Sequence, residues 1–146
     1  MKRVLFVCTG NTCRSPMAEC MFRALAHEDG LSALSAGVYA LSGAPASEGA
    51  KRAMQRRGLS LEGHKSRAVT QVLLESVDLV VGMSASHILQ LQMIYPACLA
   101  PMMAFDQPPV SDPYGGDDAA YEQAARDIER QLPRLLSLMK QGGTNV

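Results

Sequence analysis

The sequence has no excess of positive charge, because fourteen lysines and arginines balance fourteen aspartates and glutamates. Nucleic-acid-binding proteins usually carry a clear basic excess, so this balance argues against that class of partner. No apolar run approaches the ~20 residues that a membrane-spanning helix needs. The chain passes from Met1-Lys2-Arg3 directly into an apolar segment, without the pattern of a signal peptide. We therefore expect a cytoplasmic protein that binds neither nucleic acid nor membrane.

Cysteine and histidine are scarce, and neither shows the spacing of a metal site. We expect no metal and no cofactor. Without an export signal, the cysteines should be reduced thiols; they are Cys8, Cys13, Cys20 and Cys98. The length of 146 residues suits one domain with a sizeable core, so we expect a single domain over 1–146 and a monomer.

Apolar runs and helix signals alternate along the chain. Strands are expected at 2–7, 31–36, 78–83 and 98–103, and helices after Ser15-Pro16, Ser47, Thr70 and Ser84. Segment 105–118 holds three prolines and two glycines, which predicts a loop before a long helix that Pro133 kinks or breaks. The alternation predicts an α/β fold, a small doubly wound domain with a central four-stranded parallel sheet flanked by helices.

The segment "CTGNTCRS" at 8–15 lies between the first strand and the first helix. Ligands of doubly wound sheets bind at the carboxyl ends of the strands, and backbone N–H groups before a helix can surround an anion. The segment lacks the Gly-Lys-Ser/Thr ending of a nucleotide-binding loop. It predicts a phosphate-binding loop after the first strand, formed by Thr9, Gly10, Asn11, Thr12, Cys13, Arg14 and Ser15.

Two side chains of this loop indicate chemistry. Arg14 can hold two phosphate oxygens at once, and Cys8 is separated from it by five residues. A thiol at a helix N-terminus beside an arginine favours the thiolate, which is a nucleophile. We expect Ser15 to cap the helix and donate to that thiolate, and Gly10 to relieve the tightest part of the turn. A cysteine alone would instead indicate a small buried hydrophobic residue.

Attack on a phosphorylated group also needs an acid for the leaving group and a base for water. Asp112 lies in the loop rich in proline and glycine, followed by Pro113, and can supply both. Taken alone, Asp-Pro is an ordinary turn. His27 and His87 lack such a context, and we interpret both as ordinary helix residues.

These motifs resemble the low-molecular-weight protein tyrosine phosphatase family. The loop 7–15 and the late Asp112-Pro113-Tyr114 carry the resemblance, and "SAGV" at 35–38, "HKSR" at 64–67, "DLVVGM" at 78–83 and the last helix fall at that family's landmarks. The resemblance implies that Cys8 forms a phosphocysteine, that Arg14 binds the phosphate, and that Asp112 acts first as acid and then as base.

The resemblance also implies supporting roles. Hydrogen bonds from Asn11, Ser15, Ser35 and His64 would hold the loop in shape, although Ser35 and His64 could equally belong to a satisfied surface turn. Cys13 would trap an oxidised Cys8 as a reversible disulfide, as in relatives.

The substrate is indicated by the position of Thr12. Tyrosine-directed members commonly have a larger aliphatic residue there, so Thr12 and the Gly-Gly after Tyr114 resemble the bacterial branch that acts on phosphoarginine. A threonine hydroxyl can bind a polar substrate group, and a carboxylate at Asp112 suits a guanidinium. Tyr39 and Tyr114 would form an aromatic lip, which also suits phosphotyrosine, and phosphotyrosine remains the alternative.

Three rival functions fit less well. An arsenate reductase of this fold needs further cysteines near the end of the third strand, where 83–86 has none. A phosphocysteine carrier has no use for Arg14 or Asp112, and a non-catalytic phosphate-binding module has no use for Cys8. A basic cluster in the second helix indicates a solvated face, with an acidic partner as the alternative; it comprises Lys51, Arg52, Arg56 and Arg57.

Overall fold

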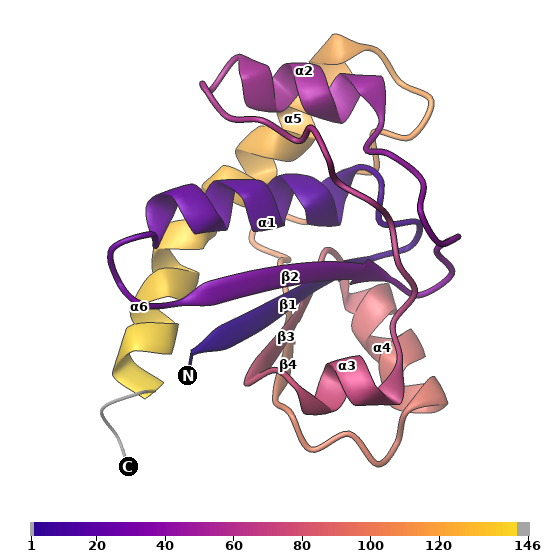
Figure 1. The fold of residues 1–146 in the computed structure, drawn as a ribbon, viewed down its shortest axis with the longest axis vertical. Coiled ribbons are helices and arrows are strands. Elements are labelled where there is room, and N and C mark those ends of the chain that lie inside the picture. Colours follow the sequence, from indigo (N-terminus) through magenta and orange to yellow (C-terminus); the bar gives the residue numbers. More distant parts are fainter. Residues whose placement is uncertain (1, 143–146) are drawn as a thin grey trace.

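The first strand, β1 (Arg3–Cys8), is covered on both faces, as its unbroken apolar sequence predicts. In the computed structural model, which describes residues 2–142, Val4 and Phe6 pack into one hydrophobic cluster, while Leu5 and Val7 pack into a second. Side chains of a strand alternate between its faces, so β1 separates two cores. The strand therefore lies in the middle of a three-layer structure (Figure 1).

Three further strands complete a parallel sheet in the order β2-β1-β3-β4, which confirms the predicted four-stranded parallel sheet. They are β2 (Ser32–Gly37), β3 (Leu79–Gly82) and β4 (Met102–Ala104). The fourth strand was expected over 98–103, but 98–101 does not pair as a strand. Pro101 has no N–H to donate and Leu99 is almost fully exposed, so this segment gains little from joining the sheet.

Helices cover both faces, which confirms the doubly wound arrangement (Figure 1). One face carries α1 (Arg14–Leu25), α2 (Glu48–Gln55), α5 (Asp118–Glu129) and α6 (Leu132–Gly142), and the other carries α3 (Gln71–Glu75) and α4 (Ala85–Ile94). The first core includes Phe6 between Phe22 and Phe105, with ring centroids 5.8 and 6.0 Å away. No helix among residues 2–142 is long and apolar enough to cross a membrane.

Two helix boundaries test the sequence signals directly. Ser15 was expected to cap the first helix, but α1 begins at Arg14 and Cys13 occupies the cap position. The hydroxyl of Ser15 is used elsewhere, as described below. The break expected at Pro133 is confirmed: α5 ends at Glu129 and α6 begins at Leu132. Pro133 thereby falls in the first turn of α6, where its missing N–H has no intrahelical partner to lose.

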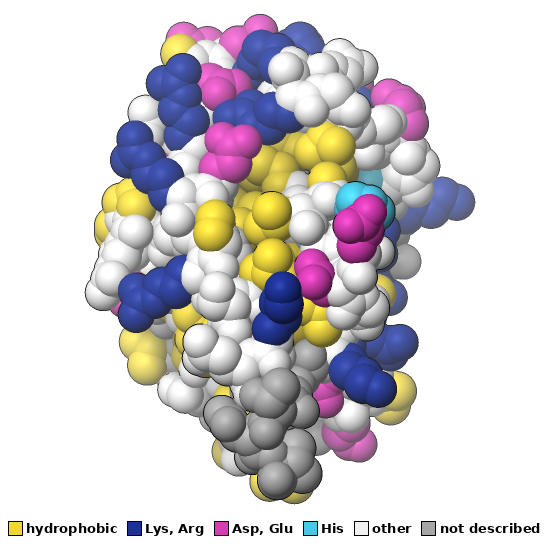
Figure 2. Space-filling view, turned by 90° about the vertical axis from the view of Figure 1, so that its left-hand side faces the viewer, with side chains coloured by type: hydrophobic (Ala, Val, Ile, Leu, Met, Phe, Trp, Pro, Cys, Tyr) yellow, Lys and Arg dark blue, Asp and Glu magenta, His cyan; other side chains and the backbone are white. Residues whose placement is uncertain are grey.

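The basic cluster that begins on α2 is only in part the expected solvated face: Arg52 and Arg56 are exposed, but they and the largely buried Arg57 pair with carboxylates of α5. Arg57 lies 2.7 Å from Glu122 and 2.9 Å from Glu129, both on α5. Arg56 also reaches Glu122, and Arg52 reaches Asp118. Figure 2 shows positive and negative side chains interleaved at the end of the molecule where α2 and α5 lie. The cluster therefore joins two helices.

The strand order reverses at β1, because β2 lies on one side of it and β3 on the other. In open α/β sheets the crevice beyond such a switch point is where ligands bind. Cys8 is the last residue of β1, so the fold places it at this crevice.

Candidate active site

Cys8, Arg14 and Asp112 meet around one cavity of about 250 Å³. Cys8 ends β1 and Arg14 begins α1, so the two flank the loop 9–13, while Asp112 comes from the loop before α5. The structure therefore brings Asp112 to two residues that precede it by more than half of the chain. The cavity is lined by Cys8, Thr9, Gly10, Thr12, Cys13, Arg14, Asp112 and Tyr114.

The Cys8 thiol is surrounded by hydrogen-bond donors. Its Sγ lies 2.9 Å from Ser15 Oγ and accepts a bond of 3.3 Å from the backbone N–H of Asn11. Cys8 is 3% exposed and Ser15 is fully buried. Donors converging on a sulfur stabilise its anionic form and would also stabilise it as a leaving group.

Asn11 holds the loop in its conformation. Its φ is +57°, a left-handed value that side chains other than glycine adopt at a cost. Its side-chain Nδ2 donates to Ser15 Oγ at 2.9 Å and to Ser35 Oγ at 3.0 Å. Its Oδ1 accepts from the backbone N–H of Arg67 at 3.0 Å. These bonds offset the backbone strain inside a fully buried site.

The glycine that this loop requires is not Gly10. A Cβ at Gly10 would meet nothing closer than Thr12 Oγ1 at 3.8 Å, so Gly10 does not relieve the crowding that was expected there. A Cβ at Gly37, at the end of β2, would lie 2.5 Å from Thr9 O and 3.0 Å from Asn11 N. The loop backbone therefore packs directly onto Gly37, and the left-handed residue is Asn11.

Arg14 links the two halves of the site. Its Nη1 donates to Val110 O at 3.3 Å, and its Nη2 lies 3.6 Å from Asp112 Oδ2. The Arg14 side chain is 9% exposed and that of Asp112 is 58% exposed. A buried guanidinium below an accessible carboxylate is an arrangement that binds an anion and exchanges a proton with its substituent.

The loop that carries Asp112 is anchored to α5. Ser111 donates through its N–H and its hydroxyl to Asp127 Oδ2, each at 3.4 Å, and Asp127 is 4% exposed. Tyr114 N–H donates to Asp112 Oδ1 at 3.1 Å. Asp117 caps α5 and Asp118 pairs with Arg52, so neither lines the cavity.

The predicted substrate-contacting residues differ in their placement. Thr12 and Tyr114 line the cavity, and Tyr114 is 82% exposed at its mouth. Tyr39 is exposed and does not line the cavity, although its backbone N–H donates to Thr9 O. The cavity therefore has one aromatic wall.

The residues at 64–67 support the loop from outside the cavity. His64 Nε2 donates to the backbone oxygen of Asn11 at 2.8 Å, which fixes the proton of His64 on that nitrogen. Arg67 Nε donates to Ser35 O at 3.1 Å. The structure thus gathers Asn11, Ser15, Ser35 and His64 in one hydrogen-bonded group.

His87 is a residue that the sequence interpretation missed. It is 3% exposed, and its Nε2 lies 3.0 Å from Thr9 Oγ1 while its Nδ1 lies 3.0 Å from Ser84 Oγ. Burial, with a smaller effect of the Arg14 charge, lowers the pKa of His87 to about 4, so it is neutral at pH 7. Its position after β3, beside β1, could have indicated this contact.

Cys13 lies in the same loop and lines the same cavity. Its Sγ lies 3.4 Å from Ser47 Oγ and 3.5 Å from Tyr121 OH. Burial raises the pKa of Tyr121, so the phenol stays neutral beside the thiol. Cys8 and Cys13 are both free thiols.

Within residues 2–142, no group of three or more His, Cys, Asp or Glu side chains could hold a metal ion.

Comparisons with known proteins match this architecture along nearly its whole length. The family model "Low molecular weight phosphotyrosine protein phosphatase" matches residues 3–144. A protein-arginine-phosphatase from Bacillus subtilis is 35% identical over 147 residues, covering 94% of this chain and 96% of the relative. A probable low molecular weight protein-tyrosine-phosphatase, EpsP, from Ralstonia nicotianae is 34% identical over 148 residues, covering 94% and 99%.

A solved phosphatase structure is similar to this chain as well. A mutant of the YwlE arginine phosphatase with a phosphorylated active-site serine superposes with a TM-score of 0.88 at 32% identity, covering 94% of this chain and 95% of that one. The matched motifs, the fold and these similarities agree. The chain belongs to the low molecular weight protein tyrosine phosphatase family and is a protein phosphatase of that type.

Proposed function

We propose that the protein removes phosphate from arginine side chains of proteins through a phosphocysteine on Cys8. The observation that supports this most is the single cavity that holds the Cys8 thiol, the Arg14 guanidinium, the Asp112 carboxylate and the Thr12 hydroxyl. Phosphotyrosine is the alternative substrate, because the relatives include phosphatases of both kinds at nearly equal identity.

In the first step the Cys8 thiolate attacks phosphorus and the bond from phosphorus to the substrate nitrogen breaks. Arg14 and the N–H groups at the start of α1, which lack intrahelical partners, hold the phosphoryl oxygens. Asp112 gives its proton to the departing nitrogen, which leaves as part of a guanidinium. The resulting carboxylate then pairs with that cation, an interaction that a phenol leaving group would not make.

In the second step Asp112 takes a proton from water, and the hydroxide attacks the phosphocysteine. The bond from phosphorus to sulfur breaks and inorganic phosphate is released. Ser15 Oγ, 2.9 Å from the sulfur, donates to the thiolate as it leaves. Neither step requires a metal or an external reductant.

The preference for arginine is argued from the walls of the cavity. Thr12 presents a hydroxyl where an aliphatic side chain would add apolar area against an aromatic ring. Tyr114 is the one aromatic residue among those lining the cavity, and it is mostly exposed. A polar guanidinium can interact with the Thr12 hydroxyl and the Asp112 carboxylate, whereas a tyrosine ring could pack only against Tyr114.

The deciding experiment measures initial rates on two peptides of matched sequence, one carrying phosphoarginine and one phosphotyrosine, at pH 7. We expect a higher kcat/KM for phosphoarginine, and Thr12→Ile should shift the ratio towards phosphotyrosine. A preference for phosphotyrosine would overturn the substrate assignment and leave the mechanism intact.

Asp112→Ala tests the mechanism independently of the substrate class. We expect kcat to fall by roughly 10²- to 10⁴-fold, the usual contribution of a positioned acid and base. Phosphate should still accumulate on Cys8, detectable by mass spectrometry after an acid quench. A variant that turns over at the wild-type rate would exclude Asp112 from the chemistry.

A further inference from the structure

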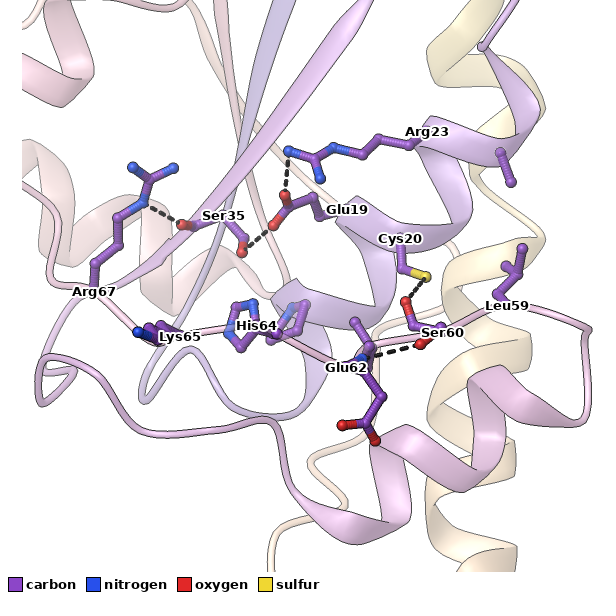
Figure 3. Close-up of a pocket in the computed structure, with 14 residues that line it drawn as sticks. Glu19, Cys20, Arg23, Ser35, Leu59, Ser60, Glu62, His64, Lys65 and Arg67 are labelled. Atoms are coloured by element: carbon purple, nitrogen blue, oxygen red, sulfur yellow. Dashed lines mark hydrogen bonds and ion pairs between the residues drawn. The ribbon is translucent and has the colours of Figure 1, made fainter.

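A second cavity, of about 650 Å³, lies between α1 and the segment 59–67. No residue of the 8–15 loop lines it, but Ser35 and His64 do, and both are bonded to Asn11. Figure 3 shows Glu19 at its wall, between the side chains of Arg23 and Ser35. The mechanism proposed above gives Glu19 no role.

The direction of the hydrogen bonds around Asn11 can be deduced from its amide. Because Oδ1 accepts the backbone N–H of Arg67, the Nδ2 group faces Ser15 and Ser35 and donates one proton to each. Both hydroxyl oxygens are therefore acceptors towards Asn11, and each hydroxyl proton must point elsewhere.

Each of these protons has one acceptor. Ser15 Oγ lies 2.9 Å from Cys8 Sγ, so its proton points at the sulfur. Ser35 Oγ lies 2.5 Å from Glu19 Oε1, so its proton points at the carboxylate. The chain of bonds thus runs outward from Asn11 in two directions, ending on Cys8 at one end and on Glu19 at the other.

We infer that Glu19 is a positioning residue for the phosphatase reaction. By accepting the Ser35 proton it holds Ser35 as an acceptor for Asn11, and Asn11 in turn keeps the Ser15 hydroxyl directed at Cys8. Glu19 touches neither the substrate cavity nor the thiol. The inference rests on the proposed role of Cys8 as the nucleophile.

The surroundings of Glu19 suit this role. Its Oε2 pairs with Arg23 Nη2 at 2.6 Å, and Arg23 also donates to Ala33 O on β2 at 2.8 and 3.2 Å. Arg23 thus occupies the Glu19 oxygen opposite to the one that accepts from Ser35. The Glu19 side chain is 14% exposed, and a hydrogen bond to a charged, mostly buried acceptor is stronger than one between neutral groups.

The test replaces Glu19 by Met, which keeps the volume and removes the acceptor. We expect Glu19→Met to lower kcat by roughly tenfold, the usual cost of losing a charged hydrogen bond. Alkylation of Cys8 by iodoacetamide at pH 7 should slow by a similar factor, because Ser15 no longer points steadily at the sulfur. Alkylation reports on the thiol without any phosphorylated substrate.

Arg23→Met is the matched control, since it removes the ion pair of Glu19 and leaves the bond to Ser35. It should retain wild-type kcat and alkylation rate. Glu19→Gln is combined with Arg23→Met because Arg23 would otherwise attract the oxygen of the new amide. Without Arg23, that oxygen can turn to Ser35 and accept its proton. Glu19→Gln with Arg23→Met should therefore stay active, while Glu19→Met with Arg23→Met should not. This comparison decides the role if the single Met variant folds poorly.

The path through Ser35 is tested by a double-mutant cycle. Adding Glu19→Met to Ser35→Ala should cause no further loss if Glu19 acts only through Ser35. Three outcomes would overturn the inference. The first is a double variant whose kcat falls by the product of the two single losses. The others are wild-type alkylation of Cys8 in Glu19→Met, and an Arg23→Met variant as slow as Glu19→Met. Turnover that persists in Cys8→Ser would instead overturn the proposed nucleophile, and the inference with it.

Discussion

At the scale of single residues, the site depends on a loop whose backbone is strained at Asn11 and crowded at Gly37. Neither feature involves a reacting atom. Both set where the N–H groups and the Cys8 sulfur point, so a small change at either position should affect catalysis through geometry.

Gly37→Ala should lower the free energy of unfolding by about 2–3 kcal/mol, because its Cβ would lie 2.5 Å from the backbone oxygen of Thr9 and backbone cannot move aside cheaply. Urea unfolding measures this. Gly10→Ala is the control: its Cβ meets nothing closer than 3.8 Å, so stability should not change. Equal costs at the two glycines would show that the contact at Gly37 is unimportant.

Peroxide should convert Cys8 and Cys13 into a disulfide, since both are free thiols that line one cavity. Peptide mass spectrometry should find the crosslinked pair, and a reductant should restore activity. In Cys13→Ser the same treatment should inactivate the protein irreversibly. Absence of the crosslink in the wild type would contradict this prediction.

At the scale of elements, the pairing of α2 with α5 fixes the segment that begins at Asp117 and, through Asp127, the loop that carries Asp112. Gly49 of α2 permits the close approach, since a Cβ there would overlap the Tyr121 ring of α5. Arg52 of α2 and Arg57, just after its end, add ion pairs to this contact. The two helices thus form one support for the loop that carries Asp112.

Arg57→Met should lower the free energy of unfolding by about 1–2 kcal/mol at pH 7, an amount reduced from the full ion-pair energy because the pair is partly solvated. Hydrogen bonds from Arg57, with smaller ones from Arg56, lower the pKa of Glu122 from 4.5 to about 2. The stabilisation is therefore complete above pH 4.5 and is lost as the pH falls towards 2.

Urea unfolding at pH 7 and at pH 3 measures the difference between wild type and Arg57→Met at each pH. The difference should be smaller at pH 3. Arg126→Met is the control, because Arg126 lies 3.4 Å from Glu122 with an exposed side chain and should cost less. A difference that does not depend on pH would exclude Glu122 as the partner.

At the scale of the whole molecule, three segments far apart in the chain meet at the carboxyl ends of the strands. β1 supplies Cys8, the end of β2 supplies Gly37, and the loop before α5 supplies Asp112. A ligand that binds in the cavity where these segments meet contacts parts of the chain that separate on unfolding. Its binding should therefore stabilise the whole fold.

Inorganic phosphate should raise the melting temperature by roughly 5–10 °C at one hundred times its dissociation constant, which corresponds to about 2.7 kcal/mol. Differential scanning fluorimetry measures this shift. Arg14→Met should abolish most of it, because the buried guanidinium is the main cation of the cavity. An equal shift in the variant would identify a general salt effect in place of binding at this site.

Much of this protein could be predicted from local patterns in its sequence. The apolar run before Cys8, the alternation of strands and helices, and the proline and glycine signals around Asp112 and Pro133 each reflect a preference of a few neighbouring residues. The spacing of Cys8 and Arg14 across one short loop is likewise local. These features indicate the sheet and the loop after its first strand because they follow from short-range backbone and burial preferences. The role of Asp112 as the acid stays a prediction.

Other features arise only when distant segments pack together. Ser15 was predicted both to cap the first helix and to donate to Cys8, and only the second contact is present. The bond from Asn11 Nδ2 that orients the Ser15 hydroxyl is a product of the packed loop and has no local signal. Glu19 and Gly37 have no local signal for their contacts with Ser35 and with the loop backbone. The carboxylate partners of Arg52 and Arg57 come from α5 and likewise cannot be read from the residues around these arginines. Their partners lie tens of residues away, and only the tertiary fold determines which side chains meet.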